Sequence, residues 1–158
     1  MNDLKNNPIK RSPYLAPLSR EHHEGLLLAW KIKQGVRKGV ELTRITAYCN
    51  WFFKEHLAPH FHTEEKVFSQ VLSPEHPLLL QMLAEHRSIE KVLQELAKKT
   101  MHSQVQLLDF GTSIELHIRF EERFFFNHIE SVLSPEQLSQ LQIAQHQTPE
   151  EWPDPFWL

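Results

Sequence analysis

The stretch HFHTEE at residues 60–65 returns in altered form as HIRFEE at residues 117–122. Each copy has the form H-x-x-x-E followed by a second glutamate. Residues at positions i and i+4 of a helix lie one turn apart on the same face. A helix over each stretch would therefore present an imidazole and a carboxylate together, His60 with Glu64 and His117 with Glu121.

Each copy is preceded by a Glu-His pair, Glu21-His22 and Glu85-His86. The chain thus has two repeated halves, each with two histidines and one glutamate of interest. Packed around an approximate two-fold axis, these halves would gather four imidazoles and two carboxylates inside a helical bundle. Burying these groups without a cation would be costly. The set predicts a two-metal site that favours iron or manganese and also accepts zinc.

The hydrophobic spacing predicts an all-α fold, an up-down-up-down four-helix bundle. Residues 1–18 contain three prolines and are expected to form an extended arm, with Ser19 as the N-cap of the first helix. Gly35 and Gly39 are expected to interrupt that helix. Three further helices are expected at about 40–72, 79–100 and 103–133, the first of them kinked at Pro59.

The C-terminal region is expected to add a short helix and an aromatic tail. Pro135 can occupy the first position of a helix that extends to about Gln145. The tail that follows carries Trp152, Phe156 and Trp157, and we expect it to dock on the bundle. The apolar stripe of the preceding helix is predicted to include Val105, Leu108, Ile114, His117, Phe120, Phe124 and Ile129.

Length and composition favour a single domain over residues 1–158, with the bundle at about 18–133 and the C-terminal helix and tail at 134–158. The 17 basic and 20 acidic residues are interspersed, so nucleic acid is not an expected partner. No stretch approaches the length of a membrane span. Cys49 is the single cysteine, and a cytoplasmic location is expected.

With these motifs, the sequence resembles the hemerythrin-like, or HHE cation-binding, family over about residues 18–133. The resemblance implies two metal ions, typically iron, with Glu64 and Glu121 as bridging carboxylates. Its implied ligands are His22, His60, Glu64, His86, His117 and Glu121.

The resemblance also bears on function. Oxygen-carrying hemerythrins have a further histidine one turn after the third-helix ligand, where this sequence has Glu90, and an aspartate where it has Glu121. These differences move the sequence toward the four-histidine, two-glutamate group that includes the iron–sulfur cluster repair proteins. Those proteins usually carry an N-terminal cysteine-bearing domain, which is not expected in this sequence, so the resemblance alone does not carry repair activity over to it.

The leading functional hypothesis is a non-haem di-iron protein that binds or reacts with oxygen, nitric oxide or peroxide, for sensing or detoxification. One alternative is an iron store or donor related to iron–sulfur cluster repair, and another is a metal-dependent regulatory binding module whose aromatic tail responds to the metals. A ferritin-like oxidase ranks lower because the ligand helices lack its E-x-x-H motif. Glu90 is expected to act behind the ligands, and His56 is expected on the core face of its helix. No particular protein partner is predicted.

Overall fold

The computed structural model describes residues 10–98, 103–146 and 150–158. Its regular structure over these residues is helical, without strands, which confirms the all-α prediction. The elements in chain order are α1 (Ala16–Arg37), α2 (Leu42–Phe52), the π-helix η2 (Phe53–Leu57), α3 (Ala58–Phe68), α4 (Pro77–Lys98), α5 (Gln104–Phe120), the π-helix η3 (Glu121–Phe125), α6 (Phe126–Val132) and α7 (Pro135–Ser139).

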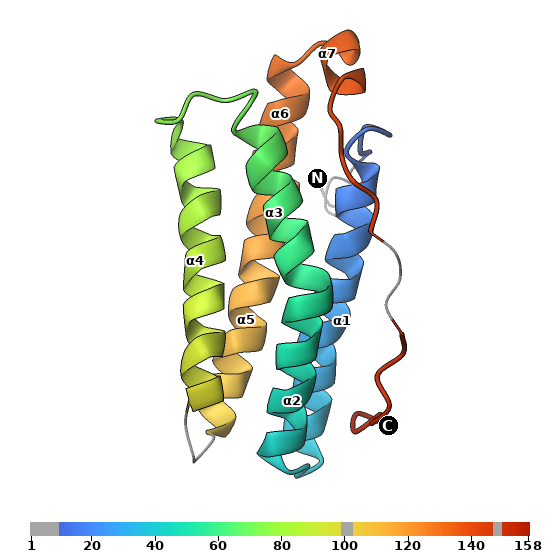
Figure 1. Ribbon diagram of the computed structural model, residues 1–158, viewed down its shortest axis with the longest axis vertical. Coiled ribbons are helices and arrows are strands. Elements are labelled where there is room, and N and C mark those ends of the chain that lie inside the picture. The colour runs from blue at the N-terminus through green and yellow to red at the C-terminus, as the bar shows by residue number, and fades with distance from the viewer. Residues whose placement is uncertain (1–9, 99–102, 147–149) are drawn as a thin grey trace, which may run out of the picture.

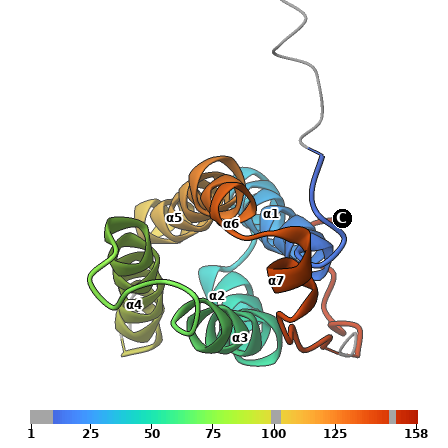
Figure 2. The same ribbon diagram turned by 90° about the horizontal axis from the view of Figure 1, so that it is seen from above.

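The long helices form four rods that lie side by side. α1 and α4 are each one rod, whereas α2, η2 and α3 form a second continuous rod and α5, η3 and α6 form the fourth. Consecutive rods run in opposite directions (Figure 1), and the view from above shows them around a common centre (Figure 2). α7 lies at one end, from which the C-terminal segment returns along the side of the bundle near α1.

α1 begins earlier than predicted, because Leu15 and not Ser19 occupies the N-cap position. Pro17 lies in the first turn, where its missing N–H costs nothing since those groups have no partner within the helix. Leu15 and Leu18 are fully buried, so burial holds this turn in place. The extended arm expected over residues 1–18 is therefore wrong from Ala16 onward, and residues 1–9 lie outside the described chain.

α1 also ends later than predicted, because Gly35 lies within it. This glycine is needed for close packing: a Cβ there would come within 2.8 Å of both Ile45 and Phe156. Gly39 has a φ of 71° and forms the turn after the helix, a backbone conformation that favours glycine.

The two π-helices modify the second and fourth rods. The second rod continues as a helix through Pro59, because the wider turn η2 immediately precedes it and accommodates the missing N–H. In the fourth rod, η3 adds a residue to the turn after Phe120. This rotates the following side chains, so that Phe125 and Phe126 are buried and the predicted core residue Phe124 is 62% exposed.

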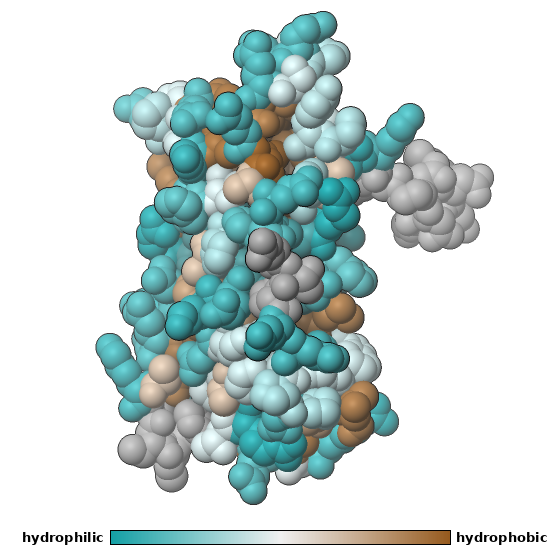
Figure 3. Space-filling model, turned by 45° about the vertical axis from the view of Figure 1, so that its right-hand side comes forward, coloured by the Kyte–Doolittle hydropathy of each residue, from teal (hydrophilic) through white to brown (hydrophobic). Residues whose placement is uncertain are grey.

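The C-terminal region partly follows the prediction. Ser134 caps α7 through a capping box with Gln137, but the helix ends at Ser139 and not near Gln145. The aromatic tail docks as expected: Phe156 is buried against Tyr48, while Trp152 and Trp157 pack beside it half-buried. The surface that faces the viewer in Figure 3 is mostly hydrophilic, with small hydrophobic patches.

The interior consists of two separate hydrophobic clusters. One contains Leu28, Phe61, Ile89 and Ile114. The other contains residues such as Leu18, Val67, Met82 and Phe125. His22, Glu64 and His86 fall in sequence between members of the two clusters, whereas His60, His117 and Glu121 alternate with cluster members at the boundary, so the rods position a polar layer where the two clusters meet. No helix of the described chain is long and apolar enough to cross a membrane.

Candidate metal centre

The structure brings all six predicted site residues together inside the bundle. Each is at most 4% exposed, and Glu64, Glu121 and His86 are fully buried. The residues come from four rods: His22 from α1, His60 and Glu64 from α3, His86 from α4, His117 from α5 and Glu121 from η3.

The donor atoms form two overlapping groups. One consists of His22, His60, Glu64 and Glu121, and the other of His86 and His117 with the same two glutamates. In each group one donor atom from every residue lies within 4.8 Å of the others. Because both groups contain Glu64 and Glu121, these two carboxylates are placed to be shared between two cations.

Within these groups every imidazole turns its Nε2 atom toward a buried carboxylate. The Nε2 atoms of His60 and His86 both lie 3.2 Å from Oε1 of Glu64. The Nε2 atoms of His22 and His117 lie 3.2 and 2.7 Å from Oε1 of Glu121. The same division of two histidines per carboxylate thus appears in both halves, across neighbouring rods.

A second set of four glutamates fixes the opposite side of each imidazole, and each one lies next in sequence to a site residue. A hydrogen bond of 2.7–2.9 Å joins each histidine Nδ1 to a carboxylate on a neighbouring rod: His22 to Glu122, His60 to Glu21, His86 to Glu65 and His117 to Glu85. These orienting glutamates connect the rods in a closed ring. Carboxylates that accept from the outer nitrogen in this way orient metal-binding histidines.

The orienting bonds determine the chemistry of the inner nitrogens. Because a carboxylate only accepts, each Nδ1 carries the proton, and in the neutral ring Nε2 is then a lone-pair acceptor. These acceptors face other acceptors, the carboxylate oxygens of Glu64 and Glu121. The buried Nε2 atoms of His60, His86 and His117 and both oxygens of Glu64 have no hydrogen-bond partner. Buried acceptors turned toward each other need a positive charge between them.

The same need appears in the pKa values of the protein without a cation. Burial alone would lower the pKa of His60, but the carboxylates of Glu64 and Glu21 outweigh it and raise the pKa to about 9. For His117, Glu121 and Glu85 likewise outweigh burial and raise the pKa to about 10. Burial would raise the pKa of Glu64, yet the histidines around it hold that pKa well below its ordinary value. The site thus takes up positive charge by protonation when nothing else supplies it.

Two residues left open by the sequence lie outside these groups. His56 lies half-buried and stacks on Phe52, with ring centroids 4.4 Å apart. Glu90 is not among the partners of the four outer nitrogens, which the orienting glutamates take, and its role behind the ligands stays a prediction. Glu90 is one helical turn from His86 and half-buried.

The orienting glutamates were missed by sequence reasoning although their signal was visible. The repeated pairs Glu21-His22 and Glu85-His86, and the second glutamate of each HxxxEE stretch, contain all four. Two arginines behind them were also missed: Arg87 contacts Glu65, and Arg11 contacts Glu122. Arg11 lies in the region expected to be an extended arm, and nothing in its local sequence indicates this contact.

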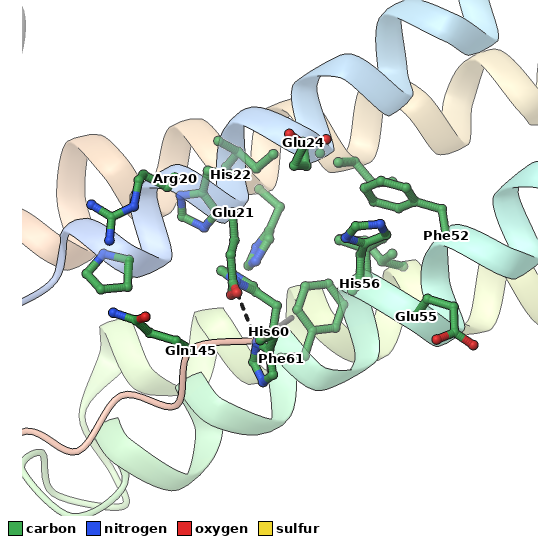
Figure 4. A pocket seen from close by; sticks show the side chains of 18 residues that line it. Arg20, Glu21, His22, Glu24, Phe52, Glu55, His56, His60, Phe61 and Gln145 are labelled. Atoms are coloured by element: carbon green, nitrogen blue, oxygen red, sulfur yellow. Dashed lines mark hydrogen bonds and ion pairs between the residues drawn. The ribbon is translucent and has the colours of Figure 1, made fainter. Parts of the chain in front are cut away.

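A pocket of about 280 Å³ adjoins the histidines between α1 and the second rod. Its inner wall is apolar and includes Phe61, Ile89, Ile114 and Ile118. Figure 4 shows Glu21 reaching across the pocket to His60, with Arg20 and Gln145 at one end and Phe52 and His56 at the other. The pocket gives a small molecule a route to the buried cluster.

The comparison with protein families agrees with this site. The model of the family described as "Hemerythrin HHE cation binding domain" matches residues 15–129, which include all six predicted site residues. Comparisons with curated proteins and with solved structures gave no match. A match over most of the chain, around a buried histidine and glutamate cluster that fits metal binding, shows that the chain belongs to the hemerythrin HHE cation binding domain family.

Proposed function

We propose that the protein holds two metal ions, iron in the first instance, and that this centre binds or reacts with a small molecule such as oxygen, nitric oxide or peroxide, for sensing or detoxification. The proposed ligands are His22, His60, Glu64, His86, His117 and Glu121. Manganese and zinc also suit these donors, and manganese shares the preference of iron for mixed imidazole and carboxylate ligands.

One observation carries this proposal: in the buried layer, hydrogen-bond acceptors face other hydrogen-bond acceptors. Four imidazoles with their outer nitrogens occupied by glutamates surround two fully buried carboxylates. A structural role would be served better by hydrophobic side chains, because a buried unpaired charge is strongly destabilising. The two overlapping groups of four residues support two cations that share Glu64 and Glu121.

The pocket supports a small and weakly polar ligand. When bound, iron would supply redox chemistry and coordination positions for an outside molecule, because four protein residues do not fill an octahedral shell. A water molecule takes up ~30 Å³ of liquid volume, so a pocket of about 280 Å³ admits a diatomic molecule with room to spare. Phe61 and the isoleucines give the pocket an apolar wall beside the histidines, which favours weakly polar molecules such as oxygen and nitric oxide.

The test of the metal centre is elemental analysis of protein purified from iron-supplemented cells. We expect two metal ions per chain, and a reproducible value below one would overturn the proposal. The variant Glu64→Gln removes the charge of a carboxylate shared by both groups and should lose metal from both. Glu136→Gln, an exposed change on α7, is the matched control and should retain the metal content of the wild type.

The test of the reaction uses the iron-loaded, reduced protein. Oxygen, nitric oxide and hydrogen peroxide are added separately to protein prepared under anaerobic conditions, and the absorption and electron paramagnetic resonance spectra are recorded. We expect at least one of the three to change the spectra. Two bound irons without any change would contradict the ligand-binding role. Iron release to an acceptor in place of a ligand response would instead favour a store or donor.

A further inference from the structure

Besides its histidine, each of the four orienting glutamates contacts a second side chain. The chemical nature of this second partner differs among the four. Two of the glutamates pair with arginine: Glu65 with Arg87 at 2.9 Å, and Glu122 with Arg11 at 3.0 Å. The two halves of the bundle therefore match at these positions, since each half places one guanidinium behind one orienting glutamate.

The remaining two glutamates break the symmetry. Glu85, which orients His117, accepts a hydrogen bond of 2.8 Å from Gln81 one helical turn earlier. Glu21, which orients His60, instead accepts one of 2.9 Å from His146. Gln81 belongs to the same helix as Glu85, whereas His146 belongs to the segment that follows α7, beyond the residues that match the family model.

His146 is held on both sides. Its Nδ1 atom donates to Oε2 of Glu21, and its Nε2 atom lies 3.3 Å from the Thr63 hydroxyl. A single neutral tautomer satisfies both contacts, with Nδ1 as donor and Nε2 as acceptor. The other carboxylate oxygen of Glu21 accepts from Nδ1 of His60 at 2.9 Å. A continuous path of hydrogen bonds thus connects the C-terminal segment with one imidazole of the metal centre.

The pocket lies on the same side of the centre. It is lined by both histidines of the first group, His22 and His60, but by only His117 of the second group. Glu21 and His146 also line it. An outside molecule that enters here meets the imidazoles of His22 and His60, which both line the pocket. His86 instead lies behind Phe61, stacked on it with ring centroids 3.8 Å apart.

We propose that His146 is a positioning residue that tunes the metal position at His22 and His60 through Glu21. The proposal rests on the proposed two-metal function. With His146 in place, Glu21 is fixed in direction and shares its negative charge between two donors. Without His146, Glu21 is free to turn in the pocket, and the orientation of His60 toward the metal is less well defined.

The experiment compares stepwise metal binding and azide binding, with azide as a small anionic probe. Cobalt(II) serves as the spectroscopic metal, titrated into metal-free protein, and azide is then titrated into the loaded form. In His146→Ala we expect one of the two metals to bind about three- to ten-fold more weakly, which corresponds to the loss of one hydrogen bond. We expect the azide affinity to fall by a similar factor and the azide-dependent absorption to shift.

Two further variants distinguish positioning from a general structural effect. In His146→Asn the side-chain amide nitrogen takes the place of Nδ1, so it should restore the azide affinity and spectrum. Gln81→Ala removes the corresponding partner of Glu85 and should weaken binding of the other metal ion. It should change the azide affinity less than His146→Ala does. His62→Ala, which removes an exposed histidine on α3, is the matched control.

The outcomes separate this proposal from the function on which it rests. Fewer than one cobalt per wild-type chain would contradict the metal centre itself. Two cobalt ions with azide binding unchanged in His146→Ala, or changed equally in Gln81→Ala, would overturn only the role of His146. Failure of His146→Asn to restore what His146→Ala loses would also overturn it. Thermal melts of each variant establish that the comparison is made between folded proteins.

Discussion

At the scale of single residues, the orienting glutamates explain how four flexible side chains acquire fixed directions. Each imidazole has one nitrogen bound to a carboxylate of the neighbouring rod and the other directed at Glu64 or Glu121. A charged acceptor makes such a hydrogen bond about twice as strong as a neutral one does. Removing the charge of one orienting glutamate should therefore weaken metal binding without removing a metal ligand.

Glu85→Gln tests this expectation at His117. The amide oxygen can still accept from Nδ1, but the charge is lost, and we expect metal affinity to fall ~10- to 100-fold. Competition with a chelator of known affinity measures the change. Glu95→Gln, on the exposed face of the same helix, is the control and should bind metal as the wild type does. An affinity for Glu85→Gln within two-fold of the wild type would contradict the orienting role.

The raised histidine pKa values predict how the stability of the metal-free protein depends on pH. The pKa of His60 is about 9 in the folded protein, against an ordinary value of 6.5. The protonated ring therefore contributes stability that is complete below pH 6.5 and is lost as the pH rises through 9. His117, with a pKa of about 10, acts in the same direction. Urea unfolding of metal-free protein should show the midpoint falling from pH 6.5 to pH 9.

The metal-loaded protein should behave differently in the same pH range. Protons and metal ions compete for the same Nε2 atoms, so rising pH favours the metal. Its unfolding midpoint should stay level or rise between pH 6.5 and 9. On the acid side, the lowered pKa of Glu64 means that its contribution to the metal-free form is lost as the pH falls below 4.5. A metal-free midpoint independent of pH above 6.5 would show that the histidines are not paired with the carboxylates.

The residue types of the centre could be predicted from the sequence because their spacing is local. His60 with Glu64, and His117 with Glu121, each lie one turn apart on one helix, and any helix brings them together. The outer contacts could not be predicted in this way. Arg11 contacts Glu122 and His146 contacts Glu21 across more than 100 residues, and only the packing of the rods brings them together.

At the scale of helices, the π-turns show where helical periodicity stops being a guide. The pattern i, i+4 predicts a buried Phe124 from Phe120, but the wider turn η3 buries Phe125 instead. The same turn begins at Glu121, so the shift occurs at a residue of the centre. The existence of the helices and their approximate limits could be predicted from the sequence. This change of register could not, because no local residue type specifies it.

Gly35 tests how tightly the C-terminal tail is held against α1. A Cβ at this position would lie 2.8 Å from the ring of Phe156, which is rigid and buried, so Gly35→Ala should lower the free energy of unfolding by ~1–3 kcal/mol. Gly111→Ala is the matched control. Its Cβ would find its nearest neighbours at 3.6 Å, an ordinary contact, and alanine favours the helix by ~1 kcal/mol. Denaturant unfolding of both variants measures the difference.

The contrast between the two glycines decides the interpretation. A loss in Gly35→Ala together with greater exposure of the tail tryptophans, seen by fluorescence quenching, would place the effect at the Phe156 contact. Equal stability of the two variants would mean that the tail contributes little to the fold. Metal content should be unchanged in Gly35→Ala, because Phe156 belongs to the hydrophobic cluster beyond the centre.

At the scale of the whole molecule, the polar layer divides the hydrophobic core into two clusters. Leu28 and Ile114 belong to one and Leu18 and Phe125 to the other, with the predicted ligands at the boundary between them. At this boundary the rods are joined by histidine and glutamate contacts as well as by aromatic packing such as that of Phe61 on His86. A cation shared by the rods would cross-link them at this boundary.

Metal removal should for this reason lower the stability of the whole bundle. Binding stabilises a folded protein by ~2.7 kcal/mol per site when free metal exceeds Kd 100-fold, and 1 kcal/mol shifts Tm by ~2–4 °C in a domain of this size. Two sites therefore predict a Tm ~10–20 °C lower after chelation, measured by circular dichroism. Hydrogen exchange should rise most around residues 60–64 and 117–121, at the boundary of the two clusters. A double variant, His60→Ala with His117→Ala, provides the control, because a chelator should leave its Tm nearly unchanged. An equal Tm for metal-loaded and chelated wild type would show that the rods are held together without a metal cross-link.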